Sequence, residues 1–168
     1  MNASQFSPLH FRTFRPGDET AFRVLNEDWI TKHFALEEED SAILNDPHGQ
    51  ILAPGGQICL AEMACTVVGC CALVVTGEGE LELAKMTVAE SARGLGIGRR
   101  LLVFAIDVAR RMGAQRLYLE SNTKAAAAVH LYEELGFRHL AGPAHGSKYS
   151  RANVFMELPL ASTVQPNP

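Results

Sequence analysis

The sequence has no excess of positive charge and no apolar run long enough to cross a bilayer. Its 168 residues carry 15 Lys and Arg against 19 Asp and Glu, a formal net charge of −4. Nucleic-acid-binding domains usually present a basic face, so this balance argues against that class. A membrane-spanning helix needs roughly 20 apolar residues, which excludes a membrane span. The N-terminal stretch MNASQFSPLHFRTFR lacks a basic-then-apolar signal layout, which predicts a cytoplasmic protein.

Cysteine is scarce, and the four that occur do not have the spacing of a metal or redox site. Cys59, Cys65, Cys70 and Cys71 fall in one β-like stretch. The adjacent pair fits neither a CxxC redox motif nor a zinc knuckle. No HExxH or Cys/His ligand spacing occurs either, so no metal site is predicted. We interpret the cysteines as small buried side chains in a reducing compartment.

The length predicts one domain, because 168 residues suffice for one hydrophobic core and the chain has no linker or internal repeat. We place this domain at residues 1–160. The remaining segment, ASTVQPNP at 161–168, has no periodicity and contains two prolines. We expect it to be a flexible tail.

The patterning alternates between strand and helix periods. A strand is expected at 9–15, and a helix follows with Asp18 as its N-cap and an apolar stripe of Ala21, Phe22, Leu25, Trp29 and Ile30. Shorter signals predict a helix within 36–46 and two strands within 57–75 that turn near Cys65. Strands at 80–88, 116–120, 137–140 and 153–158 and helices near 101–112 and 124–135 complete a mixed α/β domain.

The stretch AESARGLGIGRRLL, residues 89–102, places three glycines at alternate positions where a helix begins. Glycine lets a ligand approach the main chain closely, and the first amides of a helix have no acceptor within the helix. Together they form an anion site, most naturally for phosphate. Arg93 precedes the loop and Arg99 and Arg100 follow it, although arginine so early in a helix opposes the helix dipole unless an anion is bound.

Other interpretations of this loop are less favoured. A plain turn would need one glycine rather than three, and a Walker A loop is excluded because no Gly-Lys-Ser/Thr follows. In a dinucleotide-binding oxidoreductase an acidic residue at the end of the next strand binds the ribose, and Glu120 lies at about that position. Its fingerprint requires G-x-G-x-x-G directly after a strand, whereas here the spacing is G-x-G-x-G and AESAR intervenes.

The motif Arg93-Gly94-Leu95-Gly96-Ile97-Gly98 resembles the (Q/R)xxGx(G/A) loop of the GNAT superfamily of acetyl-CoA-dependent N-acetyltransferases. ELAKMTV resembles the strand before that loop, and SNTKAAAAVHLYEELGF at 121–137 is similar to the family's later Asn…LYxxxGF segment. The resemblance covers roughly residues 80–140. It implies a single-domain α/β fold with a mixed, mostly antiparallel, splayed sheet, about four flanking helices, and acetyl-CoA in the gap.

The resemblance also implies which residues hold the co-substrate. The main-chain amides of Arg93, Gly94, Leu95, Gly96, Ile97, Gly98 and Arg99 would hold the pyrophosphate. The main chain of Met86 and Val88 would pair with the pantetheine arm, and the side chain of Asn122 would touch the cofactor near that arm.

Acyl transfer to an amine needs a neutral amine, a donor for the carbonyl oxygen and a proton for the leaving thiolate. In the family that the motifs resemble, the amine attacks directly, and Tyr132 in LYEELGF occupies the position of the family's tyrosine. A phenol with a pKa of about 10 keeps its proton at neutral pH, so Tyr132 is the candidate acid. Core packing is the alternative role. A main-chain amide near Met86 is the candidate donor to the carbonyl.

Glu82 is the candidate base. Period-2 alternation places it opposite Leu81 and Leu83, on the face of Ala84 and Met86, unless a bulge interrupts the strand. Among apolar neighbours its pKa would rise toward a value suited to relaying a proton. A solvated glutamate at a strand end is the equally supported alternative.

These inferences together predict a cytoplasmic N-acetyltransferase that moves the acetyl group of acetyl-CoA to a primary amine of a small molecule or peptide. A catalytically silent acyl-CoA-binding sensor is the alternative. The acidic run LEEED at 36–40 would attract a cationic acceptor or simply be a solvated helix start, and His130 is expected at the surface. A homodimer is expected from family habit alone.

Overall fold

The computed structural model describes residues 8–161 of the chain. The predicted tail at 161–168 therefore lies, except for its first residue, outside the described residues. The strands are β1 (Leu9–Thr13), β2 (Gln57–Met63), β3 (Thr66–Gly77), β4 (Glu80–Val88), β5 (Arg116–Ser121), β6 (Arg138–His139) and β7 (Val154–Pro159). The α-helices are α1 (Glu19–His33), α2 (Glu38–Asn45), α3 (Ile97–Arg111) and α4 (Ala126–Glu134). Three short helical turns, His48–Leu52, Glu90–Ala92 and Thr123–Ala125, accompany them.

The strands form one seven-stranded sheet in the order β1-β2-β3-β4-β5-β7-β6. Every neighbouring pair is antiparallel except β4 and β5, which are parallel. The predicted mixed, mostly antiparallel sheet is confirmed. This topology also differs from the doubly wound parallel sheet on which the dinucleotide fingerprint depends.

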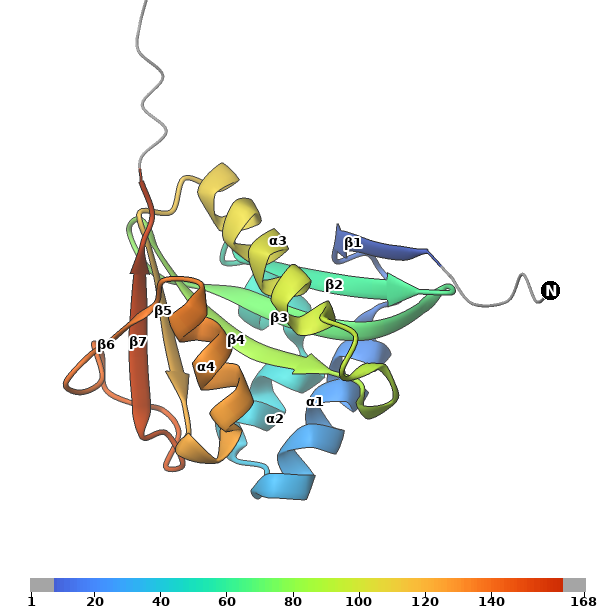
Figure 1. The fold of residues 1–168 in the computed structure, drawn as a ribbon, viewed down its shortest axis with the longest axis horizontal. Coiled ribbons are helices and arrows are strands. Elements are labelled where there is room, and N and C mark those ends of the chain that lie inside the picture. The colour runs from blue at the N-terminus through green and yellow to red at the C-terminus, as the bar shows by residue number, and fades with distance from the viewer. Residues whose placement is uncertain (1–7, 162–168) are drawn as a thin grey trace, which may run out of the picture.

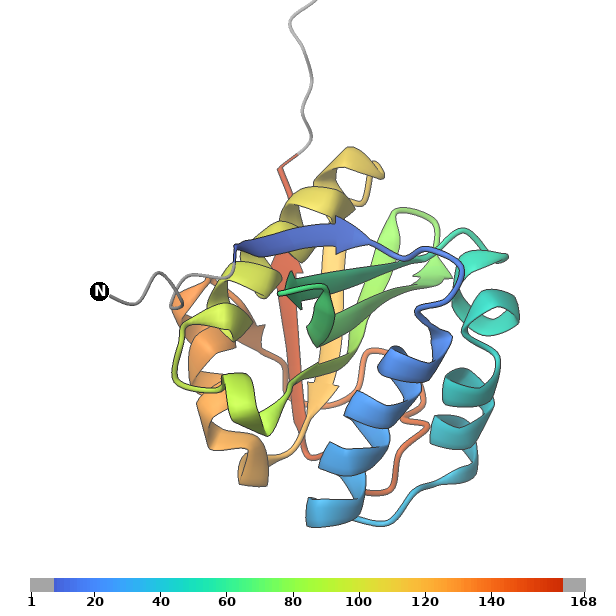
Figure 2. The same cartoon turned by 90° about the vertical axis from the view of Figure 1, so that its right-hand side faces the viewer.

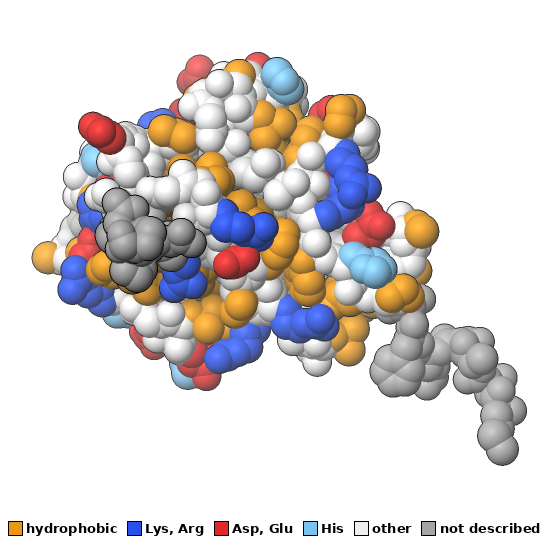
Figure 3. All heavy atoms as spheres, turned by 90° about the horizontal axis from the view of Figure 1, so that it is seen from above, with side chains coloured by type: hydrophobic (Ala, Val, Ile, Leu, Met, Phe, Trp, Pro, Cys, Tyr) orange, Lys and Arg blue, Asp and Glu red, His pale blue; other side chains and the backbone are white. Residues whose placement is uncertain are grey.

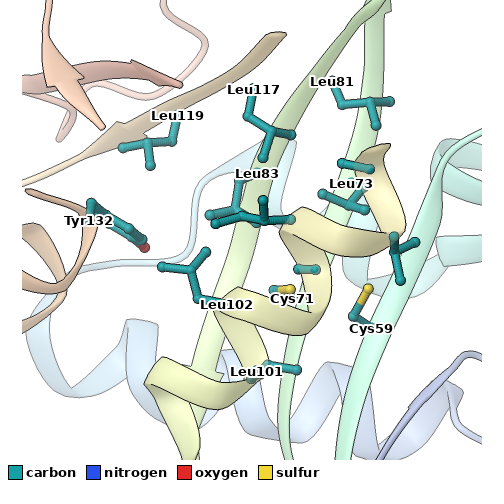
Figure 4. Close-up of a cluster of buried hydrophobic side chains, with 14 of the residues drawn as sticks. Cys59, Cys71, Leu73, Leu81, Leu83, Leu101, Leu102, Leu117, Leu119 and Tyr132 are labelled. Carbon is teal, nitrogen blue, oxygen red and sulfur yellow. The ribbon is translucent and has the colours of Figure 1, made fainter. Parts of the chain in front are cut away.

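Helices cover both faces of the sheet, with α3 and α4 on one face and α1 and α2 on the other (Figure 2). The α3 side has the larger core, in which Leu101, Leu102 and Cys71 are fully buried against the strands (Figure 4). On the α1 side, Phe22 and Ile30 of this helix are buried in the second core. Full burial of one such large apolar side chain contributes about 1.5–3 kcal/mol, so these two cores hold the sheet between its helices.

The sheet opens between its two central strands. The parallel pairing of β4 and β5 joins only Glu80–Glu82 to Arg116–Tyr118. Beyond this point β4 continues beside β3 as far as Val88, while β5 continues beside β7 as far as Ser121. The two strands therefore diverge toward their C-terminal ends (Figure 1). The predicted splay is confirmed, and beyond Glu82 it leaves one edge of β4 without a strand partner among the described residues.

The expectation that all four cysteines are buried is wrong for Cys65. The other three are buried, but Cys65 is exposed in the turn between β2 and β3. Ala64 and Cys65 both have positive φ, 51° and 62°, as a two-residue hairpin turn requires. The apolar run continues through this turn, so composition alone could not separate turn from strand.

Asp18 occupies the N-cap position of α1, as predicted, but its carboxylate does not cap the helix. It accepts hydrogen bonds from the Arg12 guanidinium and, at 2.7 Å, from the amide of Arg15. Asp18 therefore ties β1 to the start of α1 through side-chain and loop contacts rather than through the helix amides.

No α-helix within residues 8–161 is long and apolar enough to cross a membrane. On the face shown in Figure 3, Lys and Arg side chains lie in separate groups among acidic and apolar ones. That face offers no continuous basic surface of the kind that nucleic-acid binding requires.

Candidate functional site

A cleft lies where β4 and β5 separate. It contains about 790 Å³ of space not filled by atoms, open solvent at its mouth included. Helix α1, both central strands, α4 and residues 149–152 line it. Four of the predicted site residues, Glu82, Met86, Asn122 and Tyr132, share this cleft although 50 positions separate the first from the last. The cleft passes through the opening of the sheet and so connects the α4 side with the α1 side.

The glycine loop ends at the N-terminus of α3, as predicted. Gly94 and Gly96 have φ of 79° and 73°, in the left-handed region that favours glycine, and Gly96 is the N-cap. A Cβ built on either glycine would have no atom of another residue within 4 Å. Arg100 is the first residue of the helix whose amide has a main-chain acceptor, the carbonyl oxygen of Gly96 at 3.2 Å. Among the described residues, the amides at 97–99 have no acceptor, so the loop fits an anionic group.

The arginines of the loop have other partners. Arg93 donates from Nε to the carbonyl oxygen of Val88, at 3.2 Å. Arg99 forms an exposed ion pair with Glu134, at 2.8 Å, and Arg100 lies over the ring of Phe11. The conflict with the helix dipole is therefore partly relieved by the chain itself. The main-chain amides at 97–99 are free donors, and the guanidinium of Arg100, which has no hydrogen-bond acceptor among the described residues, adds to them.

A bulge in β4 overturns the expected side-chain facing of this strand. Cys70 pairs with Thr87 and Ala72 with Ala84, so β4 contains one extra residue between these pairs. Lys85, at this point, has φ of +53°. The shift turns Met86 toward the α3 side, where its Cε would lie 3.9 Å from a Cβ at Gly98, while Glu82 keeps the opposite face. The prediction that Glu82 and Met86 share a face is wrong, because the alternation breaks between them.

Tyr132 lies on α4 and points into the cleft. Only 6% of its surface is exposed, and its ring packs against Phe137 with centroids 5.6 Å apart. Its hydroxyl lies 3.7 Å from Sδ of Met86, its one hydrogen-bond contact among the described residues. Burial raises the pKa of Tyr132 above its usual value of 10, so the phenol keeps its proton at neutral pH. Tyr132 therefore packs in the core and also carries a phenolic proton that faces the cleft.

Glu82 is a partly buried carboxyl group on the α1 side of the opening. Burial raises its pKa to about 7, the nearby charge of Glu120 adds to the rise, and Lys148, Lys85 and His145 oppose it. No basic side chain of the described residues lies within 4.0 Å of Glu82 or Glu120. Burial and the charge of Glu120 are therefore the physical causes of the raised pKa that was expected for Glu82.

A second hollow, with about 830 Å³ of space not filled by atoms, open solvent included, adjoins the cleft and shares three residues with it, Glu82, Glu120 and Tyr149. The walls of this hollow come from β3, β5 and the segment 145–149. Two carboxylates therefore stand between the two hollows, on the side of the sheet away from the glycine loop.

Asn122 lines the cleft, but both ends of its amide have partners in the chain. Its Oδ1 accepts from the amide of Lys124 at 2.8 Å, and its Nδ2 donates to the carbonyl oxygen of Arg151 at 2.5 Å. Asn122 thus fixes the start of the segment before α4 against the segment before β7. A contact with the cofactor stays a prediction.

Sequence reasoning missed a buried polar network on the α1 side of the cleft. Asp40, with no exposed surface, lies between Lys85 and Arg151, and Tyr149 lies beside them. From the sequence, the acidic run at 36–40 predicted either a solvated helix start or a site that attracts a cationic acceptor. Neither describes Asp40, which is fully buried and bound to residues of the chain itself. A lysine within an apolar strand was the available signal, since lysine is almost never buried without a partner. His130 is exposed, as expected.

Comparison with known proteins identifies the family that shares these features. The chain matches the model of the acetyltransferase (GNAT) family over residues 15–137. It is 30% identical over 147 residues to the uncharacterized N-acetyltransferase YjgM of Escherichia coli, a match that covers 83% of this chain and 87% of that protein.

Solved structures share the fold. An acetyltransferase of the GNAT family from Staphylococcus aureus Mu50 superposes with a TM-score of 0.82 at 22% identity, covering 92% of this chain and all of the other. The acetyltransferase yncA of Salmonella typhimurium, solved with its cofactor acetyl-CoA, superposes with a TM-score of 0.73 at 25% identity. That match covers 96% of this chain and 99% of the other.

Proposed function

Since this chain belongs to the acetyltransferase (GNAT) family, as its two motifs predicted, we propose that it transfers the acetyl group of acetyl-CoA to a primary amine by direct attack. The acceptor is the amine of a small molecule or peptide. One observation carries the proposal: Gly98, beside the free amides at the start of α3, lies next to Met86, and Met86 lines the cleft that holds Tyr132 and Glu82. The cytoplasmic location and the homodimer stay predictions.

The residues present fit the coenzyme. Left-handed glycines keep side chains away from the amides at 97–99, which suit a pyrophosphate. The edge of β4 beyond Glu82 has no strand partner among the described residues and offers main-chain groups at Met86 and the amide of Val88 to an extended amide-bearing arm, while Arg93 contacts the carbonyl oxygen of Val88. Acetyl-CoA supplies, when bound, a thioester whose acetyl carbon accepts the amine and whose sulfur leaves as a thiolate.

Each remaining task falls to a group of this chain. Glu82, with a pKa of about 7, takes a proton from the incoming ammonium, directly or through water. A main-chain amide near Met86 donates to the carbonyl oxygen as negative charge develops there. Tyr132 holds a proton at Oη and gives it to the departing sulfur. The base and the acid approach the reaction from opposite sides of the sheet.

The charge at the acceptor side supports an amine that arrives as a cation. Glu82 and Glu120 have no close basic partner among the described residues, so their field favours an ammonium group and opposes a carboxylate. We therefore expect amines without an adjacent carboxylate to be better acceptors than free α-amino acids.

Matched pairs of amines test this function directly. We expect mass spectrometry to show the gain of one acetyl group, with thiol release, on tyramine, histamine or cadaverine. The corresponding amino acids tyrosine, histidine and lysine should have kcat/KM values about 10-fold lower, because a carboxylate faces like charges. Glu120→Gln should reduce that preference. Tight binding of acetyl-CoA without turnover on a broad amine panel would favour the silent sensor.

The pH profile tests Glu82. A base must be deprotonated, so kcat/KM should rise with pH up to about 7 and then level off. Glu82→Gln should lower kcat/KM at pH 8 by about 100-fold and remove that rise. An unchanged profile in the variant would exclude the assigned role.

Unfolding experiments provide the control for this substitution. Because the folded-state pKa of Glu82 is raised, the stability contributed by its protonated form is present below the usual value of 4.5 and lost as the pH rises through about 7. Glu82→Gln should therefore unfold at a higher temperature than the natural protein at pH 8. Lost activity in the variant would then not reflect lost folding.

A further inference from the structure

Lys85 combines a strained backbone with a buried charge. It has φ of +53° within a strand, a conformation that residues with a Cβ rarely adopt. Its side chain is 5% exposed, and its ammonium donates to Oδ1 of Asp40 at 2.6 Å and to the hydroxyl of Tyr149 at 3.1 Å. Strained residues persist where the surrounding structure holds them, and they concentrate at functional sites.

Asp40 is held rigidly enough to serve as the anchor. Its carboxylate accepts two hydrogen bonds from Arg151, both at 2.8 Å, and one from the amide of Glu37 at 3.0 Å, which closes the capping box of α2. Burial works against this charge, but hydrogen bonds from Arg151 and Lys85 outweigh it and lower the pKa of Asp40 to about 2. The anchor therefore stays charged throughout the neutral range.

The bulge decides which face of β4 meets the cofactor side. Without it, strict alternation would direct Lys85 toward the apolar core under α3, and Met86 and Val88 toward α1. With it, Met86 and Val88 pack on the α3 side, and the sulfur of Met86 meets the hydroxyl of Tyr132. The same conformation of β4 thus has two consequences. It pairs the buried ammonium of Lys85 with Asp40, and it turns Met86 toward Tyr132.

We propose that Lys85 is a positioning residue, which Asp40 anchors so that the bulge presents the main chain of Met86 to the thioester and Met86 itself to Tyr132. This inference rests on the proposed function, because it names what arranges that site. Lys85 does not touch the reacting atoms. It acts through the register of β4, and its ammonium makes the alternative register costly because that register would bury the charge among leucines.

Glycine and alanine at position 85 separate the two ways in which Lys85 could act. Both substitutions remove the ammonium and leave Asp40 bound to Arg151, but only glycine adopts a positive φ without strain. We expect Lys85→Ala to lower kcat by about 10-fold or more at saturating acetyl-CoA and to weaken the Kd for acetyl-CoA in calorimetry. Lys85→Gly should have a kcat about 5- to 30-fold higher and a Kd about 5- to 30-fold lower than Lys85→Ala, which is the preference of glycine for this conformation.

Hydrogen exchange of the main-chain amides measures the stability of the bulge without any ligand. The amides at 84–88 should lose protection in Lys85→Ala and keep it in Lys85→Gly. Asp40→Asn should lower kcat strongly in the natural background and less in the Lys85→Gly background, since the anchor acts partly through Lys85. A merely structural role would lower the unfolding temperature without this dependence on the residue at position 85.

Equal losses in Lys85→Ala and Lys85→Gly would overturn the inference and assign the effect to the ammonium itself. Full activity in Lys85→Ala would overturn it as well. Failure of the proposed function is distinguishable, because it would appear in the natural protein as absence of turnover with every amine. The exchange pattern of the variants would then still decide the role of Lys85.

Discussion

Gly96→Glu is expected to abolish binding of acetyl-CoA, raising the Kd measured by calorimetry by at least about 100-fold. Gly96 caps α3 with φ of 73°, beside amides that have no acceptor among the described residues. Glutamate there strains the backbone and places a negative charge on the proposed pyrophosphate site. Two like charges about 4 Å apart near a protein surface repel by about 4 kcal/mol, enough for a loss of this size.

Gly113→Glu is the matched control. Gly113 follows the other end of the same helix with φ of 83°, and a Cβ there would also have no atom of another residue within 4 Å. The two substitutions therefore carry similar backbone strain and the same added charge. We expect Gly113→Glu to bind acetyl-CoA like the natural protein. Unchanged affinity in Gly96→Glu, or an equal loss in both variants, would refute the placement of the pyrophosphate.

Tyr132→Phe is expected to lower kcat by about 100-fold while leaving the Kd for acetyl-CoA nearly unchanged. General acids contribute about 10²–10⁴-fold to such reactions, and phenylalanine removes only the proton donor. The ring is buried against Phe137, and the lost hydroxyl contacts only a thioether, so the fold should survive. Stopped-flow measurement of thiol release at saturating substrates would determine kcat, and calorimetry the affinity.

The opposite result for Tyr132 is equally informative. If Tyr132→Phe retained full turnover, the tyrosine would be a packing residue and the thiolate would leave without help from the chain. If turnover and affinity fell together, the side chain would shape the cofactor channel rather than supply a proton. Only a loss confined to turnover supports the assignment of an acid.

The sequence predicted those features that follow from local chemistry. Three glycines before an apolar helical period predicted the start of α3, and Gly113 predicted its end, while anion binding at that start stays a prediction. The segment around Tyr132 had a helical period and a family motif, so its helix and its place in the cleft were both foreseeable. Each of these signals lies within about 15 residues and needs no knowledge of distant partners.

Long-range contacts were not predictable in the same way. Lys85, at the bulge, donates to a carboxylate 45 positions earlier, and Asp40 looked like one more member of an acidic run. Strict alternation therefore assigned Met86 to the face of Glu82. Glu120 was considered only as a ribose-binding acid, whereas its neighbourhood with Glu82 arises from the pairing of β4 with β5. A single sequence contains no local mark for such pairings.

The short pairing of β4 with β5 has a consequence for how the molecule avoids association with other chains. A strand with unused backbone groups normally lies at the rim of a sheet, where a second chain can add to it and start aggregation. Here such a strand lies in the middle of the sheet, flanked by α3 and α4 on one side and α1 on the other. A folded neighbour cannot enter, but a narrow, extended molecule can. The chain thus keeps unpaired backbone hydrogen-bonding groups on β4 while its helices shield them from other folded proteins.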